Sequence, residues 1–280
     1  MTPHDFDYLR RLLKERSGLV LSAEKDYLLE SRLLPLARRH GMTSLGELVL
    51  RLRQPGSTAL AIAVTESMTT NETFFFRDAG TFDTFRKAVL PGLVAARAHA
   101  KTLRIWFAAC SSGQEPYSVA MILEEERALL AGWSVEMIGT DLSTEMVERS
   151  RGGLYSHFEA QRGLPIQMLA RYFDKDEQGW RIKAPLRERV KFRTINLLES
   201  FAALGTFDVI FCRNVLIYFE LPTKRNILDR MSRQMSEPGV LFLGGAETVI
   251  GVSEKFVPHP GHAGIFVPAQ SPAFARAVGQ

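Results

Sequence analysis

Apolar residues recur at helical spacing through the first seventy residues of the chain. Thr2-Pro3-His4-Asp5 combines a capping hydroxyl, a proline at the first helical position and an acid at the third, so it predicts a helix start. Gly18 ends this helix. The hydroxyls of Ser22, Ser44 and Ser57 predict three further helices, the last running to about Met68. The pattern therefore indicates an all-α segment over residues 1–70.

From about Leu103 the pattern changes to apolar runs that alternate with helical segments. Strands are predicted over residues 103–109, 135–140, 190–195, 207–212, 240–243 and 265–267. Helices are predicted from Pro116 to Leu130 and after Ser143. Alternation of this kind favours a largely parallel sheet with helices on both faces. We expect an α/β, doubly wound domain over residues 71–280, preceded by the helical domain.

The first turn of this α/β half contains residues suited to a nucleoside ligand. Ligands bind such sheets at the carboxyl ends of the strands, and the small residues 110–114 would let backbone approach them. Asp141 ends the next predicted strand, where it can accept hydrogen bonds from ribose. Glu115 would repel a pyrophosphate but can hold an amino group. Since no G-x-G-x-x-G occurs, S-adenosylmethionine fits better than NAD, although Asp141 as a helix cap and Glu115 as a helix-dipole partner are open alternatives.

Positive charge concentrates near the N-terminus. The net charge of the 280-residue chain is +4, and residues 1–53 contain ten Lys or Arg against seven Asp or Glu, a balance of +3. On the second predicted helix, Lys25, Arg32 and Arg39 are seven residues apart and form one basic stripe. Such a stripe is typical of a solvated helical face, and it also suits an acidic partner, whether phosphates or glutamate-rich helices.

Composition excludes several classes of protein. No apolar run approaches 18 residues, so no membrane-spanning segment is predicted, and the N-terminus has no secretory signal pattern. The two cysteines lie in apolar strand-like runs, which argues against a disulfide framework and for a reducing cytoplasm. The six histidines show no metal-ligand spacing. We expect a cytoplasmic, monomeric protein without a metal, and a mobile tail over residues 269–280.

Several short segments together identify a resemblance. The segments are Thr70-Asn-Glu-Thr-Phe-Phe-Phe-Arg77, Ala109-Cys-Ser-Ser-Gly-Gln-Glu-Pro-Tyr-Ser118, Gly139-Thr-Asp141, Asn196-Leu197 and Phe211-Cys-Arg-Asn-Val-Leu-Ile-Tyr-Phe219. With them the chain resembles the chemotaxis receptor methyltransferase family (CheR), from the first helix to about residue 268. The resemblance implies a Rossmann-like, S-adenosylmethionine-dependent methyltransferase domain with a small antiparallel β-subdomain insert.

The resemblance also implies a set of site residues. Those expected to line the S-adenosylmethionine site are Asn71, Thr73, Arg77, Glu115, Asp141, Asn196, Leu197, Arg213 and Asn214. In this site, Glu115 would hold the amino group of the methionine part of S-adenosylmethionine, and Asp141 would hold its ribose. The adenine would lie beside Asn196 and Leu197, while Arg77 would face the methionine carboxylate or the substrate. Tyr218 is either a buried ring with a bonded hydroxyl or a catalytic residue near the reacting carboxylate.

The implied reaction is methyl transfer to a glutamate side chain of a methyl-accepting chemotaxis receptor. It yields a glutamate 5-O-methyl ester and S-adenosylhomocysteine, for sensory adaptation. A carboxylate with a pKa of roughly 4.3 is already the nucleophile at neutral pH, so no general base is required. Catalysis should come from in-line positioning and from removal of water around the carboxylate. Arg77 would compensate the desolvated charge.

The resemblance finally gives the basic helix a partner. Lys25, Arg32, Arg38 and Arg39 are predicted to dock on the glutamate-rich receptor helices, so that charge reversal at Arg32 raises the receptor KM and spares cofactor affinity. The β-subdomain insert is expected over about residues 172–192, with strands at 180–183 and 190–192. Because residues 174–179 form only a short segment, receptor binding is predicted to be independent of a C-terminal pentapeptide.

Two other functions compete with this interpretation. A nucleic-acid methyltransferase fits the positive charge, but base N-methylation uses a (D/N)-P-P-(Y/F) motif, where this chain has Cys212-Arg-Asn-Val215. A net charge of +4 is also small for duplex binding, so no nucleic-acid partner is expected. The second is a regulator that binds S-adenosylmethionine without turnover, which the sequence leaves open.

Overall fold

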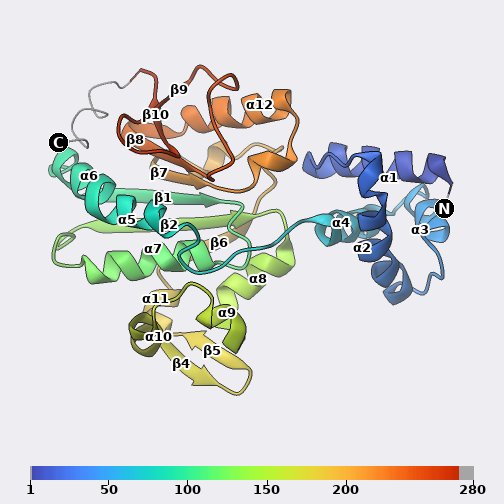
Figure 1. The fold of residues 1–280 in the computed structure, drawn as a ribbon, viewed down its shortest axis with the longest axis horizontal. Coiled ribbons are helices and arrows are strands. Elements are labelled where there is room, and N and C mark those ends of the chain that lie inside the picture. Colours follow the sequence, from blue (N-terminus) through green and yellow to red (C-terminus); the bar gives the residue numbers. More distant parts are fainter. Residues whose placement is uncertain (1, 271–280) are drawn as a thin grey trace.

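A computed structural model describes residues 2–270 of the chain, so the tail expected at 269–280 lies outside the described residues from residue 271 onward. Figure 1 shows a small helical domain beside a larger α/β domain, joined by an extended segment. The helical domain consists of α1 (Pro3–Ser17), the 3₁₀ turn η1 (Ala23–Lys25), α2 (Asp26–Arg39), α3 (Leu45–Leu52) and α4 (Thr58–Met68). Its core is a separate cluster of leucine, valine and methionine side chains, among them Leu9, Leu13, Leu29, Leu33 and Val64.

The start and end of α1 follow the prediction from local residues. The Thr2 side chain accepts from the Asp5 N–H in a capping box, and Gly18 adopts a left-handed C-cap at φ 74°. The prediction for the second helix was wrong at its start. Residues 23–25 form η1 and Lys25 is the N-cap of α2, without a side-chain capping bond. Because Lys25 precedes the helix, only Arg32 and Arg39 lie on one helical stripe.

The α/β domain is built on a seven-stranded sheet in the order β6-β2-β1-β7-β8-β10-β9. The strands are β1 (Thr102–Ala108), β2 (Ser134–Asp141), β6 (Val190–Thr194), β7 (Phe207–Cys212), β8 (Met235–Leu243), β9 (Phe256–Pro258) and β10 (Ile265–Pro268). Adjacent strands from β6 to β8 pair in parallel, and β10 pairs antiparallel with β8 and β9. The carboxyl ends of the five parallel strands therefore meet at one edge, as predicted for the ligand site.

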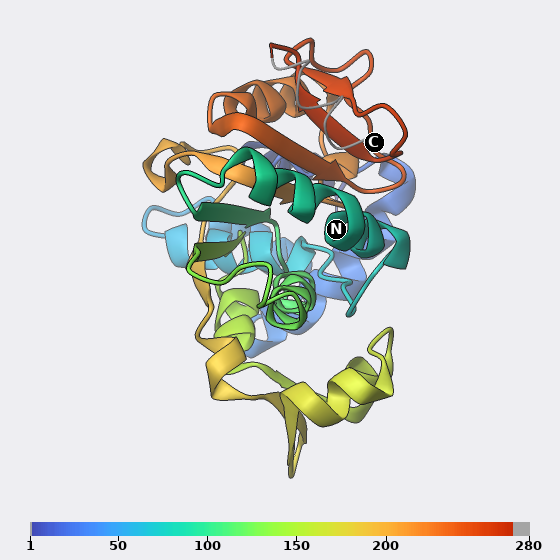
Figure 2. The same cartoon turned by 90° about the vertical axis from the view of Figure 1, so that its left-hand side faces the viewer.

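Helices cover both faces of this sheet (Figures 1 and 2). The helical elements are α5 (Ala79–Thr84), the π-helical turn η2 (Phe85–Val89), α6 (Leu90–Ala96), α7 (Gln114–Glu125), α8 (Thr144–Gly152), η3 (Ala202–Leu204), η4 (Leu216–Tyr218) and α12 (Leu221–Ser232). In β1, Ile105 and Phe107 join the core under α5–α7, whereas Trp106 joins the core under α12. This period of two fits a strand buried on both sides.

The insert lies earlier in the chain than predicted. Its three-stranded sheet has the order β3-β5-β4, from β3 (Leu154–Tyr155), β4 (Phe173–Asp176) and β5 (Gly179–Ile182). The short helices α9 (His157–Gln161) and α10 (Ile166–Tyr172) accompany it, and α11 (Ala184–Arg187) leads back to the main sheet. The expectation that residues 190–192 form an insert strand was wrong. They belong to β6, where Phe192 pairs with Gly139 of β2 and its ring is buried.

The described residues contain no helix that is both long and apolar enough to cross a membrane.

Candidate cofactor and methyl-transfer site

The loop between β1 and α7 holds an unusual backbone conformation. Ala109, Ser111 and Gly113 all have positive φ, at 58°, 50° and 89°. Such angles are uncommon for residues other than glycine and cluster where backbone must be shaped around a ligand. At Gly113 an added Cβ would lie 2.9 Å from the Ser150 Oγ. Only glycine therefore fits there without strain, and the loop backbone curls over the carboxyl end of β1.

Asp141 anchors this loop from the neighbouring strand. Its Oδ2 accepts the Ser111 N–H at 2.7 Å and its Oδ1 accepts the Ser143 N–H at 2.9 Å. Burial raises the pKa of the Asp141 carboxyl, and the backbone N–H bonds oppose that rise. The helix cap itself is the Ser143 side chain, which accepts from the Met146 N–H. Each carboxylate oxygen has a second lone pair, so Asp141 can also accept from a ribose.

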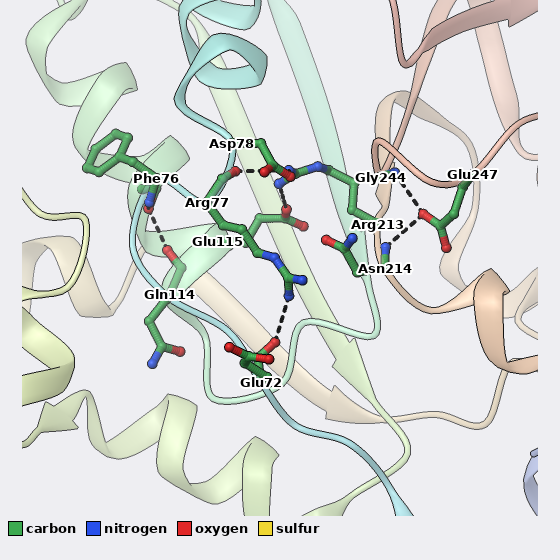
Figure 3. Close-up of polar contacts among 11 residues, drawn as sticks. Glu72, Phe76, Arg77, Asp78, Gln114, Glu115, Arg213, Asn214, Gly244 and Glu247 are labelled. Carbon is green, nitrogen blue, oxygen red and sulfur yellow. Dashed lines mark hydrogen bonds and ion pairs between the residues drawn. The ribbon is translucent and has the colours of Figure 1, made fainter.

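Glu115 and Arg213 form a buried pair at the centre of Figure 3. The Arg213 side chain is only 2% exposed and donates to the Glu115 Oε2, to the Arg77 carbonyl at 2.9 Å and to the Asp78 carboxylate at 2.7 Å. Burial raises the pKa of Glu115, and the guanidinium opposes that rise. No described side chain donates to the Glu115 Oε1, so this oxygen can accept from an amino group.

Arg77 comes from the extended segment between the domains. Its Nη1 donates to the Glu72 carbonyl at 2.9 Å, and its guanidinium lies 5.7 Å from the centre of the Phe74 ring. The same segment is fixed on the α/β domain by Phe75, which is fully buried and packs edge-on against Tyr155 and Phe173. The backbone two residues before Arg77 is thus held on the α/β domain.

These residues surround one cavity that is open to solvent. All nine predicted cofactor residues line it, together with Tyr218. The helical domain contributes Ser17 and Leu19 to the same wall. Lys25, Arg32, Arg38 and Arg39 do not line it. The cavity therefore combines segments that are far apart in the sequence, from both domains and the segment between them.

Direct contacts hold the helical domain against the cavity. The Val20 N–H donates to the Tyr218 carbonyl at 3.2 Å, and the Asn196 amide donates to the Arg16 carbonyl at 2.6 Å. Gly18 is needed here, because an added Cβ would lie 2.7 Å from the Phe219 ring. Asn196, expected beside the adenine, thus also joins the domains. In the sequence, only Gly18 indicated this contact between the domains, and Gly18 was interpreted solely as the end of the first helix.

Tyr218 lies in η4, half-buried at the wall of the cavity. The alternative of a buried ring with a bonded hydroxyl does not describe this placement. A role near the reacting carboxylate stays a prediction.

Arg32 has partners that the charge pattern did not indicate. Its Nη1 donates to the carbonyls of Met68 and Thr69, at 2.8 and 3.0 Å, at the C-terminal end of α4. Thr69 lines the cavity. Reversing the charge at Arg32 would therefore disturb the cofactor wall as well as any docking surface. Lys25, Arg38 and Arg39 are exposed.

Cys110 also lines the cavity, but its burial raises the pKa of the thiol well above the ordinary value. A protonated thiol is a poor nucleophile, so covalent catalysis through Cys110 is not supported. Within residues 2–270, no group of three or more His, Cys, Asp or Glu side chains is arranged to hold a metal ion.

Comparison with known proteins gives matches along both domains. Residues 4–69 match the family model for the all-alpha domain of CheR methyltransferase, and residues 71–265 match that for its SAM binding domain. Chemotaxis protein methyltransferase 1 of Pseudomonas aeruginosa is 43% identical over 90% of this chain and 93% of its own length. Cher2 of Pseudomonas putida is 41% identical over 90% and 93%. The chemotaxis protein methyltransferase of Escherichia coli is 34% identical over 90% and 86%.

Proposed function

The chain belongs to the CheR chemotaxis protein methyltransferase family, and we propose that it methylates glutamate side chains of methyl-accepting chemotaxis receptors. The products would be glutamate 5-O-methyl esters and S-adenosylhomocysteine, and the role would be sensory adaptation. The observation that carries the proposal is the single cavity at the carboxyl edge of the sheet, lined by all nine predicted cofactor residues and by Tyr218.

The residues around the cavity fit S-adenosylmethionine. The Glu115 Oε1 accepts no described bond and can receive an ammonium group, while Asp141 retains lone pairs for ribose hydroxyls. Asn196 and Leu197 line the part of the wall proposed for the adenine. When bound, the cofactor supplies an electrophilic methyl group on a sulfonium.

The proposed catalysis depends on placing an already ionised carboxylate. In the transfer, the C–S bond of the bound cofactor would break as the C–O bond formed, so that the glutamate would lose its negative charge and the sulfonium would become a neutral thioether. A substrate carboxylate that enters the partly enclosed cavity loses water of hydration, and its negative charge then needs a compensating cation. Arg77 lines the cavity and is the proposed cation, and Tyr218 is the proposed neighbour of the carboxylate. Neither residue has to move a proton.

We further propose that the exposed side chains of Lys25, Arg38 and Arg39 dock on the acidic receptor helices, with Arg32 holding α2 to the segment that carries the cavity wall. Opposite charges across such an interface steer association. Docking is proposed to be independent of a receptor C-terminal pentapeptide, because the β4–β5 connection is only a short turn between Asp176 and Gly179. The protein is proposed to act as a cytoplasmic monomer, without nucleic acid.

The experiment is incubation with methyl-labelled S-adenosylmethionine and receptor cytoplasmic domains, followed by mild base. Ester methyl groups are released as methanol, whereas N-methyl groups stay on the product. Base-labile label on receptor glutamates supports the proposal. Base-stable label would indicate N-methylation, and cofactor binding without transfer to any receptor would indicate a non-catalytic regulator.

A further inference from the structure

The loop that follows β7 supplies a large share of the cavity wall without being regular structure. Its cavity-lining residues are Arg213, Asn214, Val215, Tyr218 and Phe219. Asn214 has a positive φ of 59°, and η4 adds only a short 3₁₀ turn. Backbone N–H groups in such a loop need partners outside any strand or helix. What holds this loop decides where Asn214 and Tyr218 point.

A single carboxylate supplies these partners. The Glu247 Oε2 accepts the N–H groups of Asn214 and Gly244, both at 2.7 Å (Figure 3). The Glu247 Oε1 accepts those of Val215, Leu216 and Ile217, at 2.9, 2.7 and 3.3 Å. Consecutive backbone N–H groups that converge in this way form an anion-binding concavity, and bonds to an ionised acceptor are the stronger kind.

The tertiary fold delivers Glu247 to this place from a distant segment. It follows β8, which pairs in parallel with β7 so that Leu243 lies beside Cys212. The loops after the two strands therefore emerge side by side. The loops after β7 and β8 pack closely against each other. A Cβ added to Gly244 would lie 2.6 Å from the Asn214 Nδ2 and 2.8 Å from the Glu247 Oε2.

We propose that Glu247 is a positioning residue for methyl transfer. It does not line the cavity, so it acts through the backbone of residues 214–217, which sets the Asn214 side chain and the η4 turn that carries Tyr218. The inference rests on the proposed roles of Asn214 and Tyr218 in the methyltransferase. The positioning role of Glu247 requires a carboxylate, because all five backbone N–H groups that face this side chain are donors.

The substitution Glu247→Gln distinguishes the positioning role of the carboxylate from any contribution of the side chain to packing. The amide has nearly the same size, but its NH₂ group must face N–H donors on one side, so the loop has to shift. A displacement of about 1 Å can lower turnover about 100-fold. We expect kcat to fall about 10- to 100-fold with an unchanged receptor KM. Glu254→Gln is the matched control, because Glu254 is exposed in the same C-terminal part of the chain, and it should retain wild-type kinetics.

The decisive measurement is a double-mutant comparison with Tyr218→Phe. If Glu247 acts by placing Tyr218, the double variant is no slower than the slower single variant. Effects on kcat that multiply both with those of Tyr218→Phe and with those of Asn214→Ala would overturn the inference, as would wild-type kcat in Glu247→Gln. Should that variant not fold, Glu247→Asp is compared in the same way, since it keeps the charge but is one methylene shorter. A wild-type enzyme that transferred no methyl group would instead refute the proposed function and this inference with it.

Discussion

Replacing Arg213 with methionine tests the charge balance at the centre of the site. Methionine has a similar length but no charge, so it leaves the Glu115 carboxylate in its buried position without its guanidinium partner. The Arg213 side chain is 2% exposed and that of Glu115 is 13% exposed, which places the pair among buried ion pairs. Removing one partner of a buried pair costs about 3–5 kcal/mol, because the remaining charge is uncompensated.

This magnitude translates into a melting temperature. For domains of 150–250 residues, 1 kcal/mol shifts the Tm by about 2–4 °C, so Arg213→Met should lower it by about 6–20 °C. The span 71–265 of the catalytic domain falls in this size range. Thermal unfolding followed by circular dichroism measures the shift. Arg233→Met, at an exposed arginine in the same domain, should leave the Tm unchanged.

The loss should also depend on pH with a defined sign. Burial already raises the pKa of Glu115 in the folded state, and loss of the guanidinium raises it further. A carboxyl whose pKa is higher in the folded than in the unfolded state contributes its full stabilisation at pH values below the ordinary glutamate pKa. That contribution is lost as the pH rises through the folded-state pKa. Arg213→Met should therefore be closest to wild type in acid and fall behind towards neutral pH.

A second substitution can refute the reasoning. Glu115→Gln in the Arg213→Met background removes the uncompensated charge, so it should recover at least half of the lost Tm. The recovery is incomplete, because Arg213 also donates to the Arg77 carbonyl and to Asp78. If the double variant unfolds at the same temperature as Arg213→Met, the uncompensated carboxylate is not the cause.

Three further predictions concern docking and the cofactor loop. Arg38→Glu with Arg39→Glu should raise the receptor KM about ten-fold by charge repulsion, with unchanged cofactor affinity in calorimetry; Arg233→Glu is the control, and an unchanged KM would refute docking. A free C-terminal receptor pentapeptide should show no binding by calorimetry, and saturable binding would contradict the proposal. Gly113→Ala should weaken cofactor binding about ten-fold or more, since φ is 89° and the Cβ meets Ser150; wild-type affinity would show that the loop tolerates a side chain.

Much of this molecule could be predicted from the sequence because the relevant interactions are local. Thr2 and Gly18 cap α1 through atoms within a few residues, and the five parallel strands follow from apolar runs whose burial is encoded in their own side chains. The motif segments around Glu115 and Asp141 likewise indicated the residues that line the cavity. The caps and strands depend on residues that are close in the sequence, whereas the full set of site residues followed from the family resemblance of these segments.

Only the tertiary structure decided which distant partners these segments meet. Val190–Thr194 has the pattern of a strand in either sheet, and its pairing with β2 assigns it to the main sheet. The basic stripe on the second helix does not show that Arg32 donates to the carbonyls of Met68 and Thr69. The sequence around Glu247 likewise does not show that its carboxylate accepts five backbone N–H groups. Composition and periodicity describe which face a residue occupies, whereas such bonds depend on which chain segments the fold brings together.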